Sequence, residues 1–389
     1  MPSAILVDSP ALPVYDLGEG HPFAADRLRP LFALLRAHGL VAATELVRTP
    51  SADDDELRTV HERAYVEVLQ RLEGGDDWDA IEAAPRFGLG SSDNPIVPGL
   101  HFASAAIAGA TLACVRDVLE GRARAALNAS GGLHHAMPAL ASGFCVYNDL
   151  AIGIKEALAR GVERVAYVDF DVHHGDGVEF VFRADPRVLT ISFHETPRAR
   201  WPYTGRVEDR GSDAGLGSAI NVPFESGTCD ASWQSIVAAV LEPAIARFRP
   251  QLLVTQHGCD THFTDPLADL SLSTASADFA ARLTRRLADT HCEGRWVATG
   301  GGGYQPIRVL PRAWTMLWCA LADRALPTTV DPDWRREFAP REREPLPERF
   351  LDDPMDAAHG EPREREAAAR NAAMLEALRR IHPELLGDS

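Results

Sequence analysis

Lysine is almost absent from this chain of 389 residues: Lys155 is the only one, and arginine supplies the other basic side chains. Basic residues number 39 against 56 acidic ones, and the formal net charge is −17. Nucleic acids and anionic membranes bind through clustered cations, so this charge balance argues against both as partners. A cationic partner would suit the surface better.

Paired cysteines and long apolar runs are also missing. The six cysteines are scattered without a C-x-x-C pair, which is typical of buried thiols in a reducing cytosol rather than of a disulfide framework. The first residues, "MPSAILVDSPAL", contain no cationic stretch followed by an apolar core, and we expect no segment to reach the ~18 apolar residues of a membrane span. The sequence therefore predicts a cytoplasmic protein.

Apolar patterning is present in short pieces that alternate between two periods. Hydrophobic residues make up 46% of the chain, enough for a large core. Strands are expected at 4–7, 125–129, 164–170, 187–193, 219–222, 251–256 and 295–300, and helices at 25–37, 56–72, 102–120, 148–161, 232–248, 278–290 and 307–321. This alternation predicts an α/β fold, with a mostly parallel sheet flanked by helices on both faces.

The chain changes character near residue 325. We expect one folded domain over 1–324, followed by a charged, proline-rich extension over 325–389. A late helix is predicted at 363–381, where Met374, Leu378 and Ile381 could dock it on the core. The composition otherwise favours a surface extension.

The stretch "YVDFDVHHGDG" (167–177) has the spacing of a metal site. Asp169, Asp171 and His173 follow an apolar strand at intervals of two, so their side chains point to the same side. A strand that simply runs out into a polar loop is the alternative, but unpaired carboxylates at a buried strand end are costly. Asp260, in "LLVTQHGCDTH", follows another strand and would complete a set of two aspartates and one histidine, which leaves coordination positions open for water and substrate.

Two further motifs carry candidate catalytic groups. His134 and His135 in "SGGLHHAM" could act as a general base and its electrostatic partner if Asp169 and Asp176 orient the rings; two ordinary surface histidines are the alternative. Tyr304 ends "GGGGY", where its hydroxyl could stabilise an oxyanion. A phosphate loop is the alternative for this glycine run, but GxxxxGK[ST] and its lysine are missing.

These blocks, together with "SGFCVYND" and "SFHETPR", resemble the zinc-dependent histone deacetylase superfamily on the arginase–deacetylase fold. The resemblance covers about residues 5–322, and it is strongest to the bacterial acetoin utilization deacetylases, through "YDLGEGHP" and "QHGCDTH". It implies that zinc is bound by Asp171, His173 and Asp260. It implies further roles for His135 as general base, His134 as electrostatic or acid partner, Asp169 and Asp176 as orienting carboxylates, and Tyr304 as the oxyanion-stabilising group.

The resemblance also implies a substrate tunnel and two accessory sites. Phe144, Trp201 and Leu267 would form the acyl-lysine tunnel, with Gly143 and Gly302 as further substrate-binding positions and Asp93 on the rim. Arg27 resembles the arginine of an inner acetate channel. A structural K⁺ would be bound by main-chain oxygens of Asp169, Asp171, His173, Ser192 and Phe193. Two positions depart from the usual pattern: Trp201 stands where phenylalanine is common, and Leu133 where many eukaryotic relatives have tryptophan.

The expected activity is removal of acetyl groups from Nε-acetyl-lysine side chains of proteins by a Zn²⁺ enzyme, although the same ligands accept Fe²⁺. Family analogy suggests acetylated metabolic enzymes such as acetyl-CoA synthetase as substrates. An acetylpolyamine amidohydrolase, a non-catalytic metal- or acyl-ligand-binding protein and a manganese ureohydrolase are the alternatives. The sequence leaves the oligomeric state open.

Overall fold

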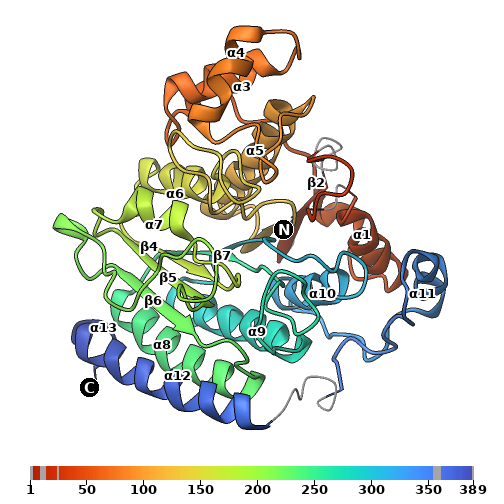
Figure 1. The fold of residues 1–389 in the computed structure, drawn as a ribbon. Coiled ribbons are helices and arrows are strands. Elements are labelled where there is room, and N and C mark those ends of the chain that lie inside the picture. Colours follow the sequence, from red (N-terminus) through yellow and green to blue (C-terminus); the bar gives the residue numbers. More distant parts are fainter. Residues whose placement is uncertain (1–2, 9–14, 24–25, 354–360, 388–389) are drawn as a thin grey trace.

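The computed structural model describes residues 3–8, 15–23, 26–353 and 361–387. Its centre is one eight-stranded sheet in the order β2-β1-β3-β8-β7-β4-β5-β6, and every strand pair is parallel (Figure 1). The strands are β1 (Ala4–Val7), β2 (Leu46–Val47), β3 (Ala125–Asn128), β4 (Val165–Asp169), β5 (Val188–Glu195), β6 (Ala219–Phe224), β7 (Leu252–Gln256) and β8 (Trp296–Thr299). The predicted parallel sheet is confirmed; the two-residue edge strand β2 was not predicted.

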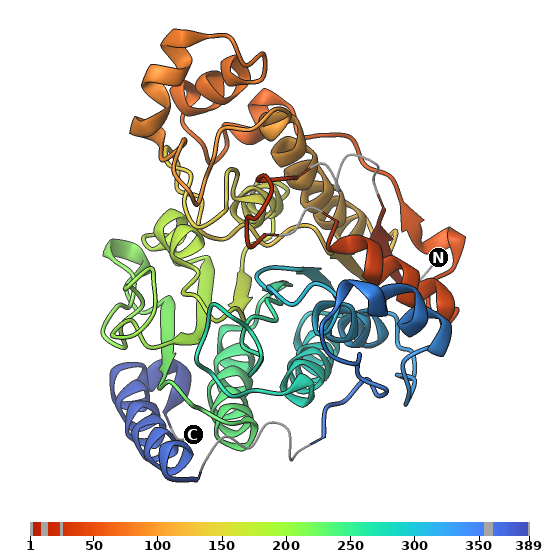
Figure 2. The ribbon, with the colours of Figure 1, turned by 45° about the vertical axis from the view of Figure 1, so that its right-hand side comes forward.

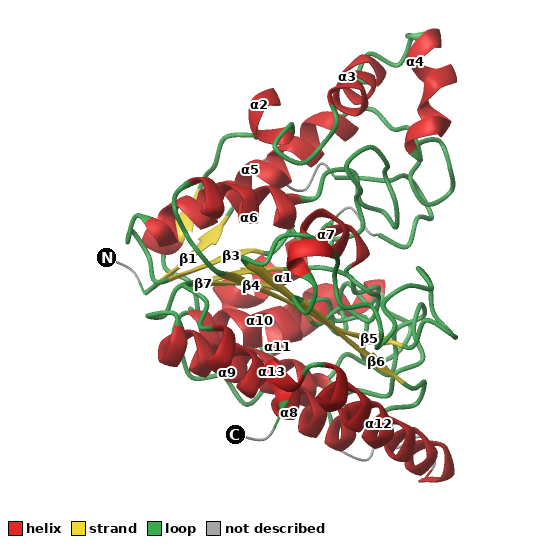
Figure 3. Ribbon diagram, turned by 90° about the vertical axis from the view of Figure 1, so that its left-hand side faces the viewer, coloured by secondary structure: helices red, strands yellow, loops and turns green. Residues whose placement is uncertain are grey.

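Helices cover both faces of the sheet, as predicted. In Figure 3 the sheet is seen on edge, with α5, α6 and α7 on one side and α8, α9, α10 and α12 on the other. The helices are α1 (Leu28–Ala37), α2 (Asp54–Leu57), α3 (Arg63–Leu72), α4 (Trp78–Ala83), α5 (Leu100–Leu119), α6 (Asp149–Ala159), α7 (Asp176–Phe182), α8 (Asp230–Phe248), α9 (Thr274–His291), α10 (Leu310–Leu321), α11 (Pro332–Phe338), α12 (Glu361–Ile381) and α13 (Pro383–Leu386). Short 3-10 turns lie at Ala43–Glu45, Ala84–Phe87, Asp213–Gly215 and Ala339–Arg341.

The predicted helix at 56–72 is two helices, α2 and α3. The side chain of Asp53 accepts a hydrogen bond from the backbone N–H of Glu56, and the Glu56 side chain accepts one from the N–H of Asp53. This capping box starts α2 before the predicted boundary, and the helix ends after one turn. The hairpin formed by α3 and α4 projects away from the sheet (Figure 2).

Helix α5 corrects one expectation. By length and composition it is apolar enough to cross a membrane, whereas no such segment was expected. Of the apolar window, 72% is buried inside the fold, where α5 packs on α6 and β3. Its apolar character is therefore that of a central core helix.

The C-terminal segment is a part of the packed structure rather than the expected surface extension. Trp334 and Phe338 of α11 join Leu346 and Phe350 in a second apolar cluster, which packs around Leu34 of α1. The predicted late helix is present as α12, which lies along α8 and β6 (Figure 1). Its Leu378 is fully buried and Met374 and Ile381 are partly buried. The composition of this segment did not reveal the packing, because its few apolar side chains that contact the core are spread among many charged residues.

Candidate metal and catalytic site

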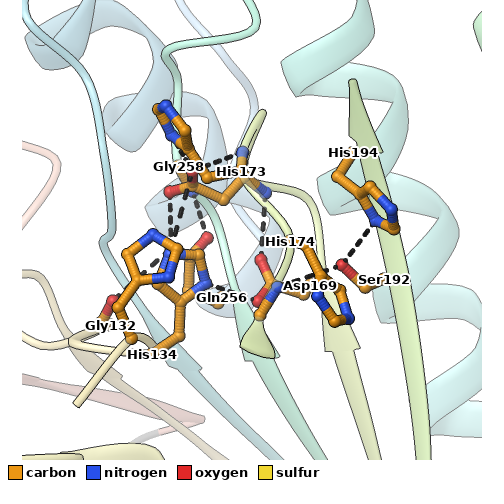
Figure 4. A network of polar contacts seen from close by, with 12 residues as sticks. Gly132, His134, Asp169, His173, His174, Ser192, His194, Gln256 and Gly258 are labelled. Carbon is orange, nitrogen blue, oxygen red and sulfur yellow. Dashed lines mark hydrogen bonds and ion pairs between the residues drawn. The ribbon is translucent and has the colours of Figure 1, made fainter. Parts of the chain in front are cut away.

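The carboxyl ends of three neighbouring strands bring the predicted site residues together. Asp169 at the end of β4 is in register with Gln256 at the end of β7, which is in register with Thr299 of β8. The chain segments that continue from these ends carry Asp171 and His173, Asp260, and the glycine run before Tyr304. Ligands bind at this edge of open parallel sheets, and Figure 4 shows the polar side chains that converge on it.

Asp171, His173 and Asp260 lie close enough to share one ion. One ligand atom from each residue falls within 4.8 Å of the others. The Nδ1 atom of His173 is 3.1 Å from Oδ1 of Asp171 and 3.2 Å from Oδ2 of Asp260. Two ligands of a tetrahedral zinc ion, each ~2.1 Å from the metal, are ~3.4 Å apart. The three side chains therefore fit a four-coordinate site with one open position.

The environment of Asp260 supports a cation at this point. Its Oδ2 atom is buried and accepts no hydrogen bond among the described residues. Burial and the neighbouring Asp171 charge both raise the pKa of Asp260 above its usual range. Two carboxylates held this close need positive charge between them, and a divalent ion would supply it.

Oδ2 of Asp171 is held by two donors: Gln256, which sequence reasoning missed, and Gly302, which was expected only as a substrate-binding position. Nε2 of Gln256 donates to Oδ2 of Asp171 at 2.6 Å, and the backbone N–H of Gly302 donates to the same atom at 2.8 Å. Gln256 is fixed in turn, because its Oε1 accepts the N–H of Gly258 at 2.7 Å (Figure 4). A Cβ atom at Gly302 would lie 2.0 Å from Oδ2 of Asp260, so only glycine allows this approach. The sequence held one indication of this role: Gln256 is a polar residue at the end of the otherwise apolar strand predicted over 251–256.

Each member of the histidine pair is oriented by the predicted carboxylate. Nδ1 of His134 lies 2.6 Å from Asp169, and Nδ1 of His135 lies 2.7 Å from Asp176. The two rings are 3.9 Å apart between centroids and both are buried, so they are not ordinary surface histidines. The hydroxyl of Tyr167 also donates to Asp169, at 2.5 Å. Tyr167 continues the spacing by two that placed Asp169 and Asp171 on one side, so that spacing could have revealed it.

The surroundings push the pKa values of the two histidines in opposite directions. For His134, burial lowers the pKa, but the carboxylates of Asp169 and Asp171 outweigh it and raise the pKa to about 9. For His135, burial and the adjacent His134 charge lower the pKa to about 4 despite Asp176. The pair therefore has the uneven proton affinities of an acid and a base partner.

A buried carboxylate, Asp149, holds the loop that carries this pair. It accepts hydrogen bonds from the backbone N–H groups of Gly132 and Leu133 and from the hydroxyl of Thr111. Burial raises the pKa of Asp149. Its place at the start of the helix predicted over 148–161 concealed this role.

A cavity of about 250 Å³ adjoins the candidate ligands through His173, which is the one of the three that lines it. Its lining also includes His135 and Tyr304, together with the aromatic side chains of Phe144 and Trp201. The ring of Trp201 packs edge-on against that of His135, with centroids 4.5 Å apart. Gly143 is required beneath it, because a Cβ atom there would lie 2.4 Å from the indole.

Tyr304 is partly buried and its backbone N–H donates to Asp265 at 2.8 Å. Asp265 was not singled out in the sequence. Burial and the charge of Asp260 raise the pKa of the Asp265 carboxyl. The same two causes raise the pKa of the Tyr304 phenol. Both effects favour a protonated Tyr304 hydroxyl, which can donate a hydrogen bond into the cavity.

Two of the remaining predicted positions line this cavity, whereas Arg27, Ser192 and Phe193 do not. Asp93 is exposed and lines it together with Leu267. Arg27 is buried, its guanidinium lies 3.8 Å from the ring centre of Phe23, and two of its nitrogen atoms have no hydrogen-bond partner among the described residues. Ser192 of β5 is in register with Asp169, and the buried Phe193 follows it. The acetate channel and the K⁺ site stay predictions.

Comparison with known proteins agrees with this geometry. The sequence model described as "Histone deacetylase domain" matches residues 21–321. The chain belongs to the histone deacetylase family. It is 35% identical over 372 residues to the acetoin utilization protein AcuC of Bacillus subtilis (strain 168), covering 96% of this chain and 95% of the relative. It is 34% identical over 358 residues to AcuC of Staphylococcus aureus (strain MRSA252), covering 92% and 91%.

Solved structures of the family share the fold. A crystal structure of an HDAC homolog from Aquifex aeolicus superposes with a TM-score of 0.86 at 27% identity, covering 97% of this chain and 99% of that one. A crystal structure of an HDAC homolog complexed with SAHA matches with the same values. The chain is therefore an HDAC-like deacetylase of the AcuC type, with a triad of side chains able to hold a metal ion.

Proposed function

We propose that this deacetylase is a metal-dependent hydrolase that removes acetyl groups from Nε-acetyl-lysine side chains of proteins, releasing acetate. The observation that carries the proposal is the convergence of Asp171, His173 and Asp260, of which His173 lines the same cavity as His135 and Tyr304. The ion would be Zn²⁺, with Fe²⁺ compatible with the same ligands. When bound, it would supply a Lewis acid and make water nucleophilic near neutral pH.

The protein's own groups divide the remaining work. Because Nδ1 of His135 is engaged with Asp176, its Nε2 atom is available to take a proton from the attacking water. Tyr304 donates a hydrogen bond to the carbonyl oxygen as negative charge develops on it. His134, held by Asp169 and with its Nε2 atom 3.9 Å from Asp171, supplies positive charge and a proton for the departing amine.

The cavity walls support a long, neutral side chain as substrate. Phe144 and Trp201 present aromatic faces suited to an aliphatic stem, and acetylation removes the lysine charge that such walls would exclude. Asp93, exposed at the rim, can accept hydrogen bonds from peptide N–H groups beside the modified lysine. An acetylated metabolic enzyme of the cytoplasm, such as acetyl-CoA synthetase, is the substrate we propose.

The deciding experiment is hydrolysis of a fluorogenic acetyl-lysine peptide by the purified protein, with and without a chelator. We expect turnover that the chelator removes and that added Zn²⁺ or Fe²⁺ restores. Acetylspermidine assayed in parallel separates a protein deacetylase from a polyamine amidohydrolase. Faster turnover of acetylspermidine, or turnover that survives complete metal removal, would contradict the proposal.

A further inference from the structure

A second cavity, which shares no lining residue with the first, lies against the C-terminal helix. Its volume of about 740 Å³ is within the range of ~300–1,000 Å³ typical of small-molecule sites. One wall is α12, through Arg370, Ala373 and Met374. The opposite wall is formed by the loops 196–198 and 206–208. Helix α12 follows the residues that match the deacetylase domain, so this cavity is built across the end of that domain.

The α12 wall is fixed in place by a buried amide. The Asn371 side chain accepts a hydrogen bond from the backbone N–H of Glu225 at 3.0 Å and donates to Thr228 at 2.8 Å and to Ser232 at 3.2 Å. Asn371 is fully buried, and so is Leu378, two turns further along the same face of α12. The cavity is therefore bounded by a docked helix and not by a loose terminus.

Positive charge exceeds negative charge in the cavity lining, although the whole chain carries −17. Three arginines and two glutamates line it: Arg198, Arg206, Arg370, Glu208 and Glu225. Glu225 pairs with both Arg198 and Arg370, and Arg370 also pairs with Glu366, which does not line the cavity. The Arg206 side chain is exposed and has no ion-pair partner within the described part of the chain.

Apolar side chains complete the lining, among them Val207, Pro223 and Met374. A ligand that satisfies both features carries an anionic group for Arg206 and its neighbours and an apolar body for the rest. We propose that this cavity binds a small organic anion with an apolar portion, such as a carboxylate, phosphate or sulfonate on a hydrocarbon or aromatic frame.

The loop 196–203 connects this cavity to the substrate cavity. Thr196, Pro197 and Arg198 line the anion cavity, and Arg200 and Trp201 line the substrate cavity. Arg200 anchors the loop through Glu195 at 2.8 Å and Asp269 at 2.7 Å. An occupant of the anion cavity thus touches the segment that presents Trp201, and we infer that it changes KM for the acylated substrate. This second part rests on the proposed function.

The binding part is tested with 8-anilinonaphthalene-1-sulfonate, an apolar ring system with one anionic group, by fluorescence titration of the full-length protein. We expect Arg206→Gln to raise the dissociation constant about fivefold, as for one exposed charge pair, and Ala373→Trp to abolish binding by placing an indole ring in the space that the ligand would occupy. Arg379→Gln and Ala372→Trp are matched controls, because both positions are on α12 but neither lines the cavity. The neutral analogue N-phenyl-1-naphthylamine should bind at least about fivefold more weakly than the sulfonate.

Identical titrations for wild type, Arg206→Gln and Ala373→Trp would overturn the site, and equal affinity for the neutral analogue would overturn its preference for anions. The coupling is measured as KM for an acetyl-lysine peptide, followed by acetate release at saturating sulfonate. KM should change in the wild type and not in Ala373→Trp. A bound sulfonate with unchanged KM would overturn the coupling alone. Because the titration requires no turnover, failure of the proposed activity remains distinguishable.

Discussion

The carboxyl edge of the sheet and the C-terminal segment both bury carboxylates, but they treat them differently. At the edge of the sheet, Oδ2 of Asp260 accepts no hydrogen bond from any residue that the structure describes. In the C-terminal segment, Asp352 is satisfied at both oxygens: Oδ1 accepts from Arg312 at 2.7 Å, and Oδ2 accepts from His262 at 2.8 Å and from the N–H of Thr274 at 3.0 Å. The comparison teaches that a completed buried network marks stability, whereas an incomplete one marks a place for a ligand.

The largest expected effect comes from a substitution at the candidate site on the carboxyl edge of the sheet. His135→Ala removes the side chain that we assign as general base, and kcat of the metal-loaded protein should fall about 10²–10⁴-fold. Thermal unfolding should change little, because the lost ring faces the cavity. Steady-state kinetics on the acetyl-lysine peptide measure the effect; kcat within tenfold of wild type would refute the assignment.

The next largest effect is expected when the hydrogen-bond network around Asp352 is broken. Asp352→Asn leaves Arg312, of which 2% is exposed, without its counter-charge, and the free energy of unfolding should fall by about 3–5 kcal/mol. Urea denaturation measures it. Asp333→Asn is the control, because Asp333 pairs with Arg336 at 2.8 Å on the exposed surface and should cost less than about 1 kcal/mol. Equal losses in the two variants would show that the segment is a loose extension after all.

The same comparison has a pH dependence. Burial raises the pKa of Asp352, but the hydrogen bond from His262 and the charge of Arg312 outweigh burial and hold the pKa well below its usual range. A depressed carboxyl pKa contributes stability above the unfolded pKa of ~3.9, and this contribution is lost as pH falls through the folded value. The difference between wild type and Asp352→Asn should therefore be complete at neutral pH and shrink only below about pH 4.

Tyr304→Phe sharpens the distinction between binding and chemistry. The variant loses the hydroxyl that donates to the developing oxyanion, and kcat should fall about 10²–10³-fold. The ring remains packed beside Phe144, with centroids 5.8 Å apart, so folding and metal content should match the wild type. Turnover near the wild-type value, with metal bound, would exclude the role of this hydroxyl.

The smallest effect concerns the support of the metal ligands. Gln256→Leu removes the donor to Asp171, and metal affinity should fall about 10–100-fold with the protein still folded. Titration with a competing chelator measures this affinity. Gln251→Leu is the control, since Gln251 precedes the same strand and bonds to the N–H of Glu163 at the opposite end. Unchanged affinity in Gln256→Leu would show that the backbone N–H groups of Gly302 and His173 suffice to hold Asp171 in place.

Much of the candidate site could be predicted because it is written in short local patterns. The alternation Asp169, Asp171, His173 at the end of an apolar strand needs no tertiary information to be noticed, since alternate side chains of an extended segment point to one side, although β4 itself ends at Asp169. The glycines beside them are required by close approaches that a Cβ atom would prevent, as at Gly302. The supporting residues Gln256, Asp149 and Asp265 carry no such pattern and were missed.

The sequence by itself determined the strand and helix alternation, the parallel sheet and the paired candidate ligands Asp171 and His173, because each depends on spacing within a few residues. The third candidate ligand, Asp260, follows another strand and came from the resemblance to the family. Only the tertiary structure decided what distant segments do to one another. Asp352 reaches His262 across 90 residues of chain, and Asn371 docks α12 against the segment after β6. Such contacts depend on how segments that are distant in the sequence are arranged in space. Neither composition nor local periodicity contains that information.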